Sequence, residues 1–266
     1  MVKVAVTGAA GRMGLRILHF LNQAQDINIV GATEAPGHSA IGSDAGTVSG
    51  EGEIGVAITS DLSQASADAD VIVDFTSPSA TLKNAELAKS AGKSMVIGTT
   101  GFTDEERDRL NELAESFPCV FAPNMSIGVN VMFEITKKLA SILGDEYDIE
   151  IVEAHHKLKA DSPSGTALRL GEAAAEGLGW DFQNTARFER HGRIGERGDK
   201  EIGLQSVRGG DTVGEHTVMF FGDGERLELT HRATNRDNFA KGVVRAVRWI
   251  YDKSPGLYTM KDVLEL

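Results

Sequence analysis

Short apolar segments alternate with helical segments over the first half of this chain, and this alternation limits the folds open to it. Val2–Thr7, Val71–Phe75 and Met95–Ile97 are largely apolar, β-branched runs typical of strands. Gly11–Asn22 and Asp104–Ser116 are expected to be helices. Strands that are apolar throughout are buried on both faces, as in a parallel sheet covered by helices on each side. The alternation therefore predicts an α/β fold whose first half contains a parallel sheet.

The pattern changes near Pro123, beyond which strands are expected to follow one another. Three successive strands are expected at Glu201–Arg208, Thr212–Phe221 and Arg226–Arg232. The glycine-rich segments 209–211 and 222–224 between these strands are typical of hairpin turns. Successive strands predict a second, α+β domain with a mixed, largely antiparallel sheet. The expected domains are residues 1–125 completed by the C-terminal segment 236–266, and residues 126–235.

Composition excludes several classes of protein. The formal net charge of -12 argues against general nucleic-acid binding, which needs a basic face. Cys119 is the only cysteine, so no internal disulfide can form, and no apolar run approaches the roughly 20 residues that span a bilayer. The chain begins with an apolar strand and not with a secretory signal. We therefore expect a cytoplasmic protein with neither a membrane nor a nucleic acid as a partner.

Three glycines, Gly8, Gly11 and Gly14, follow the first strand and begin the first helix. In this context small residues let backbone N–H groups approach a pyrophosphate, and the helix N-terminus favours its negative charge. A tight turn without a ligand would use the same glycines. Glu34 lies 20 residues after Gly14, at the end of the second strand, where a carboxylate can accept hydrogen bonds from ribose hydroxyls. Together these residues predict a Rossmann-like dinucleotide site.

The choice of cofactor depends on the surroundings of Glu34. A carboxylate there repels a 2′-phosphate, and Ala35, Pro36 and Gly37 add no cation, although Arg12 could compensate. NADH is therefore the expected cofactor, with NADPH possible. The loops 98–101 and 122–125 follow predicted strands and are candidates to contact the nicotinamide half, because ligands lie outside the carboxyl ends of parallel strands. Simple connections are the alternative interpretation of both loops.

A second group of polar residues surrounds the end of the strand predicted at 148–155. His155 and His156 face opposite sides if both are extended, and imidazole suits proton transfer near neutral pH. Lys159 adds a positive charge to the same loop. Pro163 is expected in the first turn of a helix, where the following residues can present backbone N–H groups and hydroxyls to a carboxylate. These following residues are Ser164, Gly165 and Thr166.

The His-Lys segment, together with the dinucleotide site, predicts a reductase of a small dicarboxylate. A hydrogen-bonded surface pair of histidines is the simpler alternative. No metal is expected, because no third ligand stands at a zinc spacing. The basic stretch over 187–200 is expected to be a solvated loop, with attraction of anions as the second interpretation. Structural roles are expected for His191, His216 and His231.

The segment from Glu150 to Ala167 matches the pattern E-[IV]-x-E-x-H-x-x-x-K-x-D-x-P-S-G-T-A without a break. This pattern resembles the central motif of the dihydrodipicolinate reductase family, also called 4-hydroxy-tetrahydrodipicolinate reductases. The resemblance extends over nearly the whole chain. Its other motifs are Gly8–Gly14, Asp74–Thr76, Gly98–Phe102, Asn130–Met132, Gly214–Thr217, His231–Ala233 and Phe239–Ala240.

The resemblance implies NAD(P)H-dependent reduction of a small cyclic dicarboxylate, 4-hydroxy-tetrahydrodipicolinate, in diaminopimelate and lysine biosynthesis. It implies that His155 is the proton donor or acceptor and Lys159 the second proton donor. The implied substrate positions are His156, Gly165 and Thr166, beside Ser164. The implied cofactor positions are Gly8, Ala9, Ala10, Gly11, Arg12, Met13, Glu34, Gly98, Thr99, Thr100, Ala122, Pro123, Asn124 and Met125. It also implies a homotetramer with contacts through the sheet of the second domain. Some members have an arginine where this chain has Ala35, which weakens the case for NADPH.

Two rival functions remain open on the sequence. One is another two-domain NAD(P)-dependent dehydrogenase, acting on an amino-acid semialdehyde or a related small acid. An acylating semialdehyde dehydrogenase needs a reactive thiol. Cys119 stands in an apolar strand where it is expected to be buried, which counts against this function. The other is an NADH-binding sensor that switches a partner, but no basic DNA-binding segment is present.

Overall fold

The structure is a computed structural model that describes residues 1–266, and the chain divides into two compact units. The first unit comprises residues 1–127 and 236–266, and the second comprises residues 128–235. The two units contain separate sheets and separate apolar cores.

The first unit is built on a seven-stranded sheet in the order β12-β6-β5-β4-β1-β2-β3, and every pair of neighbours is parallel. In chain order, β1 to β3 extend the sheet toward one edge, and β4, β5, β6 and β12 extend it toward the other edge. The strand order therefore reverses between β1 and β4. The strands are β1 (Val2–Thr7), β2 (Ile27–Thr33), β3 (Ile58–Thr59), β4 (Val71–Asp74), β5 (Ser94–Ile97), β6 (Pro118–Phe121) and β12 (Gly256–Tyr258).

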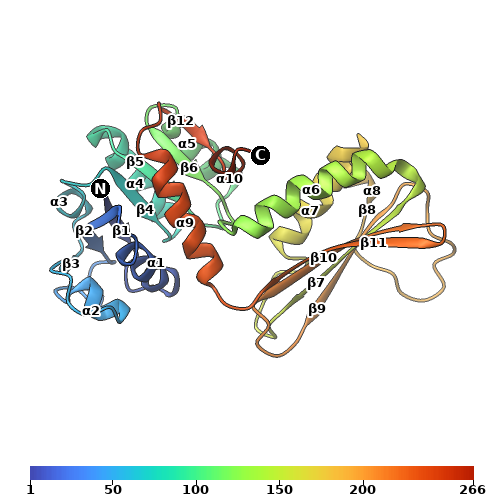
Figure 1. The fold of residues 1–266 in the computed structure, drawn as a ribbon, viewed down its shortest axis with the longest axis horizontal. Coiled ribbons are helices and arrows are strands. Elements are labelled where there is room, and N and C mark those ends of the chain that lie inside the picture. The colour runs from blue at the N-terminus through green and yellow to red at the C-terminus, as the bar shows by residue number, and fades with distance from the viewer. The chain divides into compact units, whose positions relative to one another are not determined.

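Helices cover both faces of this sheet (Figure 1). One face is covered by α1 (Arg12–Asn22), α2 (Ala45–Ser49), α9 (Asp237–Ile250) and α10 (Met260–Leu264). The other face is covered by α3 (Leu62–Ala65), α4 (Pro78–Ala91) and α5 (Asp104–Ala114). Alternate side chains of β4 enter the two cores: Val71 and Val73 join the first, and Ile72 joins the second. This double burial explains why the strand is apolar at successive positions, and it confirms the predicted parallel sheet.

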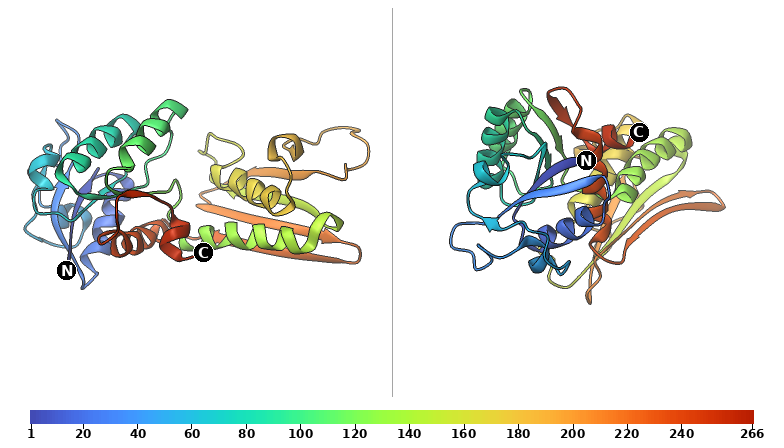
Figure 2. Two further views of the ribbon diagram at one scale, coloured as in Figure 1. Left: turned by 90° about the horizontal axis from the view of Figure 1, so that it is seen from above. Right: turned by 60° about the vertical axis from the view of Figure 1, so that its left-hand side comes forward.

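The second unit has a five-stranded sheet in the order β11-β10-β7-β9-β8. The strands are β7 (Asp148–His155), β8 (Ala186–Arg187), β9 (Ile202–Arg208), β10 (Gly214–Gly222) and β11 (Glu225–Ala233). Helices α6 (Ile127–Leu143) and α7 (Gly165–Leu178) pack on one face, and the other face carries no helix (Figures 1 and 2). The 3₁₀ turn η1 (Gly144–Glu146) precedes β7, and the short α8 (Phe182–Thr185) follows α7.

The mixed second sheet was predicted correctly, but the hairpin expected at 209–211 was wrong. β9 pairs with β7 in parallel, and β7 separates it from β10. Only β10 and β11 form a hairpin, around Asp223 and Gly224. Two of the four pairings, β7 with β9 and β8 with β9, are therefore parallel. β7 lies at the centre of the sheet, and its Ile149 and Ile151 belong to the apolar core.

The segment between β2 and β3 contains the short helix α2, and β3 begins only at Ile58. Asp44 holds this segment together. Its carboxylate accepts hydrogen bonds from the backbone N–H groups of Thr47, Ile54 and Val56, which caps α2 and ties it to the residues before β3.

Candidate active site

The glycine loop joins β1 to α1 at the point where the strand order reverses. Gly8 has φ +63°, and a Cβ atom on Gly14 would lie 2.0 Å from the carbonyl oxygen of Gly8. A larger residue at position 14 would therefore push α1 away from the strand. The N-cap residue of α1, Gly11, provides no side-chain cap, so no side chain covers the first-turn N–H groups. The loop thus fits the pyrophosphate of a dinucleotide, since a helix N-terminus open in this way binds anions.

Glu34 lies beside this loop. Its Oε1 accepts a hydrogen bond from the Ala10 N–H at 2.9 Å, and its Oε2 accepts one from the Ala35 N–H at 3.1 Å. These bonds fix the carboxylate at the end of β2, and each oxygen keeps lone pairs that a ribose hydroxyl can use. A backbone hydrogen bond also holds the glycine loop against β2: the Ala9 N–H donates to the Thr33 carbonyl at 3.0 Å.

The loops after β1, β4 and β5 contact one another. A Cβ atom on Gly8 would lie 3.1 Å from the Phe75 carbonyl, and one on Gly98 would lie 2.1 Å from the Phe75 ring. The Thr76 N–H donates to Oγ1 of Thr99 at 3.0 Å. The structure therefore brings the predicted cofactor residues at 8–13 and 98–100 to one edge of the sheet. The 122–125 loop follows β6 at the same edge, but Ala122 and Met125 are buried, so their side chains face the core.

The His-Lys segment begins on β7, where Glu153 and His155 lie on the same face of the strand. The Glu153 side chain is fully buried, and its Oε2 lies 2.5 Å from Nδ1 of His155. Arg208 binds both oxygens of the carboxylate, at 2.7 and 2.8 Å, and the Ser164 N–H donates to Oε1 at 3.1 Å. Burial works to raise the pKa of Glu153, but the hydrogen bonds from Arg208 and His155 outweigh it and lower the pKa to about 2.

His155 is neutral near physiological pH in this environment. Burial lowers its pKa and outweighs the opposite effect of Glu153. An ionised carboxylate accepts only, so Nδ1 of His155 carries the proton and Nε2 is left as an acceptor. The ring is 5.2 Å from that of His216, centroid to centroid, in an edge-to-face arrangement.

His216 was expected to be structural, but it lies directly against His155. Its Nε2 is 3.0 Å from Oγ of Ser164, and burial lowers its pKa to about 3, with a further contribution from His155. Ser164 Oγ also accepts from the Ala167 N–H and caps α7. The Ser164 hydroxyl is therefore used by the protein itself. Pro163 precedes this cap and does not enter the first turn, because Ser164 occupies the N-cap position.

The loop after His155 carries Lys159. Its Nζ lies 2.8 Å from both oxygens of Asp161, and its side chain is 19% exposed. Arg208 also donates to the Asp161 carbonyl at 2.7 Å, so the guanidinium that binds Glu153 holds this loop as well. His156 is half-buried, and its Nδ1 is buried without a hydrogen-bond partner. The loop ends at the N-terminus of α7, where Gly165 is exposed.

Two family models match this chain in succession: "Dihydrodipicolinate reductase, N-terminus" matches residues 2–125, and "Dihydrodipicolinate reductase, C-terminus" matches residues 128–264. The chain belongs to the dihydrodipicolinate reductase family. It is 55% identical to a 4-hydroxy-tetrahydrodipicolinate reductase of Citrifermentans bemidjiense and 56% identical to one of Trichlorobacter lovleyi, in both cases over 100% of each chain.

Solved structures agree with this membership. A dipicolinate-bound dihydrodipicolinate reductase from Paenisporosarcina sp. TG-14 is 27% identical, with a TM-score of 0.76 over 97% of each chain. An amine dehydrogenase from Mycobacterium smegmatis is only 14% identical, with a TM-score of 0.61 over 97% of this chain and 95% of that one, and shares the fold alone. The two-unit architecture is thus common to several dehydrogenases, whereas the sequence motifs point to the dihydrodipicolinate reductase family.

Three residues around the His-Lys segment were not assigned to the site from the sequence. Glu153, Arg208 and His216 complete the surroundings of His155. For Glu153 a signal was present, because a residue two positions before His155 on a strand shares its face. Arg208 and His216 come from β9 and β10, and their approach depends on the strand pairing that was predicted incorrectly.

The basic loop at 187–200 was expected to be solvated, and this was wrong for two of its arginines. Arg190 binds both oxygens of Glu150 at 2.7 Å, and Arg197 binds Asp148 at 2.5 Å. Arg190 also binds Glu201. These ion pairs attach the loop to β7 and β9 instead of presenting free cations. The structure contains no group of three or more His, Cys, Asp or Glu side chains able to hold a metal ion, and no helix with the length and apolar character of a membrane span.

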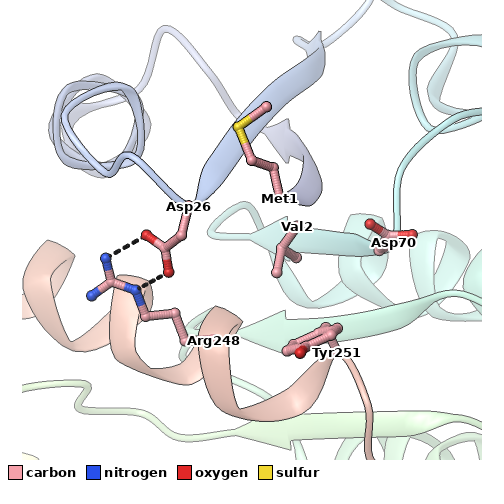
Figure 3. A pocket seen from close by; sticks show the side chains of 6 residues that line it. All are labelled: Met1, Val2, Asp26, Asp70, Arg248 and Tyr251. Carbon is pink, nitrogen blue, oxygen red and sulfur yellow. Dashed lines mark hydrogen bonds and ion pairs between the residues drawn. The ribbon is translucent and has the colours of Figure 1, made fainter.

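A hollow in the first unit lies at the opposite edge of the sheet from the glycine loop. Val2, Asp26 and Asp70 line it and stand at the amino ends of β1, β2 and β4 (Figure 3). Arg248 crosses it and binds both oxygens of Asp26, at 2.7 and 2.8 Å. Ligands of open α/β sheets bind outside the carboxyl ends of the strands, so this hollow is not part of the candidate site.

Proposed function

We propose that this protein reduces 4-hydroxy-tetrahydrodipicolinate to tetrahydrodipicolinate with NAD(P)H, a step of diaminopimelate and lysine biosynthesis. The observation that carries the proposal is the arrangement at the end of β7: a neutral imidazole with its tautomer fixed by Glu153, and the ammonium group of Lys159 on the following loop. Family membership and the glycine loop support a nicotinamide cofactor.

The reaction joins water loss to reduction. The cyclic substrate loses its hydroxyl group as water and becomes a conjugated imine. A bound nicotinamide would supply hydride to this ring, and the electron-rich carbon that results would have to receive a proton from the protein. We assign this proton to Lys159, because His155 is neutral and its only proton is held by Glu153. Nε2 of His155 is then an acceptor suited to removing a proton during the loss of water.

The carboxylates of the substrate need positive partners. The N-terminus of α7 supplies N–H groups at Gly165 and Thr166, and His156 stands on the loop that leads to it. The similar Paenisporosarcina structure was solved with dipicolinate, a planar dicarboxylate. We propose that His156, Gly165 and Thr166 bind the substrate carboxylates, and that Ser164 supports them by capping α7.

We propose NADH as the preferred cofactor. The Glu34 carboxylate is fixed beside the glycine loop, and Ala35 follows it without a charge. A 2′-phosphate would meet a carboxylate of like charge, and residues 35–37 supply no cation to offset it. Steady-state kinetics with both cofactors test this directly, since a higher kcat/KM with NADPH would contradict it.

We also propose that the protein is a homotetramer assembled through the face of the second sheet that carries no helix. Val207 is 51% exposed on this face, and Nε2 of Gln205 is buried without a partner. An exposed apolar residue beside an unsatisfied amide is expected where another subunit docks. Sedimentation equilibrium measures the assembly, and a monomer at micromolar concentration would contradict the proposal.

The activity itself is tested by mixing the protein with NADH and the condensation product of pyruvate and aspartate semialdehyde. Loss of NADH absorbance that needs both the product and the protein is expected. The same assay with other amino-acid semialdehydes tests the rival dehydrogenase function. Turnover with one of those aldehydes, and none with the condensation product, would refute the proposed substrate.

A further inference from the structure

A carboxylate is buried at the carboxyl end of β4 without a cationic partner. Asp74 has no exposed surface. Its Oδ1 accepts hydrogen bonds from the hydroxyls of Thr76, Thr81 and Thr99 at 2.7, 2.8 and 3.1 Å, and its Oδ2 accepts one from the Asn84 amide at 2.6 Å. All four donors are neutral. No Lys, Arg or His forms an ion pair with Asp74, so its negative charge is not compensated.

The position of this charge is informative. β4 lies between β1 and β5, with Asp74 in register with Thr7 and Ile97. The strand order reverses between β1 and β4, and ligands of open α/β sheets bind at such a reversal. Asp74 also ties together the loops that form this edge, because it binds Thr76 on one loop and Thr99 on the next.

Stability alone does not account for a charge at this place. Burying a carboxylate costs free energy unless it is paired, and neutral residues could fill the same volume. The start of α4 reduces the cost, since Thr81 and Asn84 belong to its first turns and the helix N-terminus favours negative charge. The protein therefore maintains a fixed negative charge next to the candidate cofactor site.

A nicotinamide ring is neutral when reduced and carries a positive charge when oxidised. A fixed negative charge in a medium of low dielectric constant stabilises the oxidised form more than the reduced form. We propose that Asp74 is a positioning residue that orders the 75–76 and 98–100 loops and raises the affinity of the site for oxidised relative to reduced nicotinamide. This inference rests on the proposed use of a nicotinamide cofactor.

The test compares the dissociation constants of NAD⁺ and NADH, measured by calorimetry on the full-length protein. Asp74→Asn preserves the shape and removes the charge. For unit charges on the order of 10 Å apart at an effective dielectric constant of about 20, the ratio Kd(NAD⁺)/Kd(NADH) is expected to rise about tenfold. Asp26→Asn, which removes a charge at the opposite edge of the sheet, is the matched control and should leave the ratio unchanged.

A second variant covers the case in which Asp74→Asn fails to fold. Asn84 is half-buried on α4, and Asn84→Lys would place a cation on the Asp74 carboxylate without removing it. The ratio should rise in the same direction, whereas Asn84→Gln should leave it unchanged. A ratio that stays constant in the folded charge variants, even if both affinities fall, would show a purely structural role and overturn the inference. Failure of the wild-type protein to bind either nucleotide would instead refute the proposed cofactor.

Discussion

Glu153 and His155 lie on the same face of β7 and are joined by a 2.5 Å contact between Oε2 and Nδ1. The carboxylate is itself fixed by Arg208 and by the Ser164 N–H. The imidazole therefore has one orientation and one tautomer, with Nε2 as its available nitrogen. A side chain two residues away thus determines which proton transfers His155 can perform.

Replacing Glu153 with Gln should lower kcat by about 10- to 100-fold, because the neutral amide no longer fixes the tautomer of His155. The affinity for NADH should remain near normal, which fluorescence titration can check. Stability should also fall by roughly 3 kcal/mol, because Arg208 loses its ionised partner. Glu215→Gln, which affects an exposed ion pair with Arg232, is the control and should have little effect on either property. An unchanged kcat in folded Glu153→Gln would contradict this role.

Replacing Lys159 with Ala should lower kcat by about 10²- to 10⁴-fold while the NADH affinity stays near normal, because the variant lacks the proposed proton donor. Single-turnover measurements of NADH oxidation would separate the chemical step from binding. Lys157→Ala removes an exposed cation from the same loop and is the matched control. Near-normal turnover in Lys159→Ala would exclude this lysine as the donor.

His155→Ala should likewise lower kcat strongly without weakening NADH binding, since Nε2 is the proposed acceptor during water loss. Glu153 should keep its position in this variant, because Arg208 still binds both oxygens of its carboxylate. His191→Ala, on the exposed loop at 187–200, serves as the control. If His155→Ala kept its turnover, the proton-transfer role would belong elsewhere.

His216 should make the stability of the protein depend on pH. Burial lowers its pKa to about 3, whereas the unfolded chain titrates near 6.5. The unfolded state therefore binds the proton first, and stability from this residue is present above pH 6.5 and is lost as the pH falls toward 3. Between pH 7 and pH 5 the loss from this group should be about 2 kcal/mol.

Urea denaturation at the two pH values, for the wild type and for His216→Gln, measures this contribution. The variant should lose less stability than the wild type over the same interval. Both measurements stay above pH 4.5, below which the lowered pKa of Glu153 would add its own loss. Equal losses in the two proteins would show that His216 is not the titrating group.

Introducing a cation beside Glu34 should change the cofactor preference. Ala35→Arg would place a guanidinium where a 2′-phosphate is expected, and kcat/KM with NADPH should rise by about tenfold or more. Ala35→Gln provides a neutral side chain of comparable reach as the control. The prediction fails if the arginine variant gains no more NADPH activity than the glutamine variant.

Local patterns in the sequence were sufficient to nominate much of the candidate site. Gly8, Gly14 and Glu34 were proposed because strand ends, helix starts and a short spacing define them. His155 and Lys159 were proposed for the same reason, since they lie at and just after the end of one strand. Periodicity also gave the parallel sheet, because burial on both faces leaves consecutive apolar residues.

The contacts that were missed join segments far apart in the chain. Arg208 reaches Glu153 only because β9 pairs with β7, and nothing in the local pattern distinguishes this pairing from a hairpin with β10. Asp74 was visible as a polar residue in an apolar strand, but three of its neutral donors come from the loop after β5 and from α4. Such partners depend on register and packing, which short-range spacing does not determine.

β12, α9 and α10 belong to the first unit, so the sheet and core of that unit are completed by residues that follow the second unit in the chain. During synthesis, residues 1–127 leave the ribosome with the edge of β6 unpaired and with the surface later covered by α9 still open to water. Residues 128–235, in contrast, contain every strand of their own sheet. The first unit is consequently completed only after the second unit has been synthesised, although residues 1–127 precede the second unit in the chain.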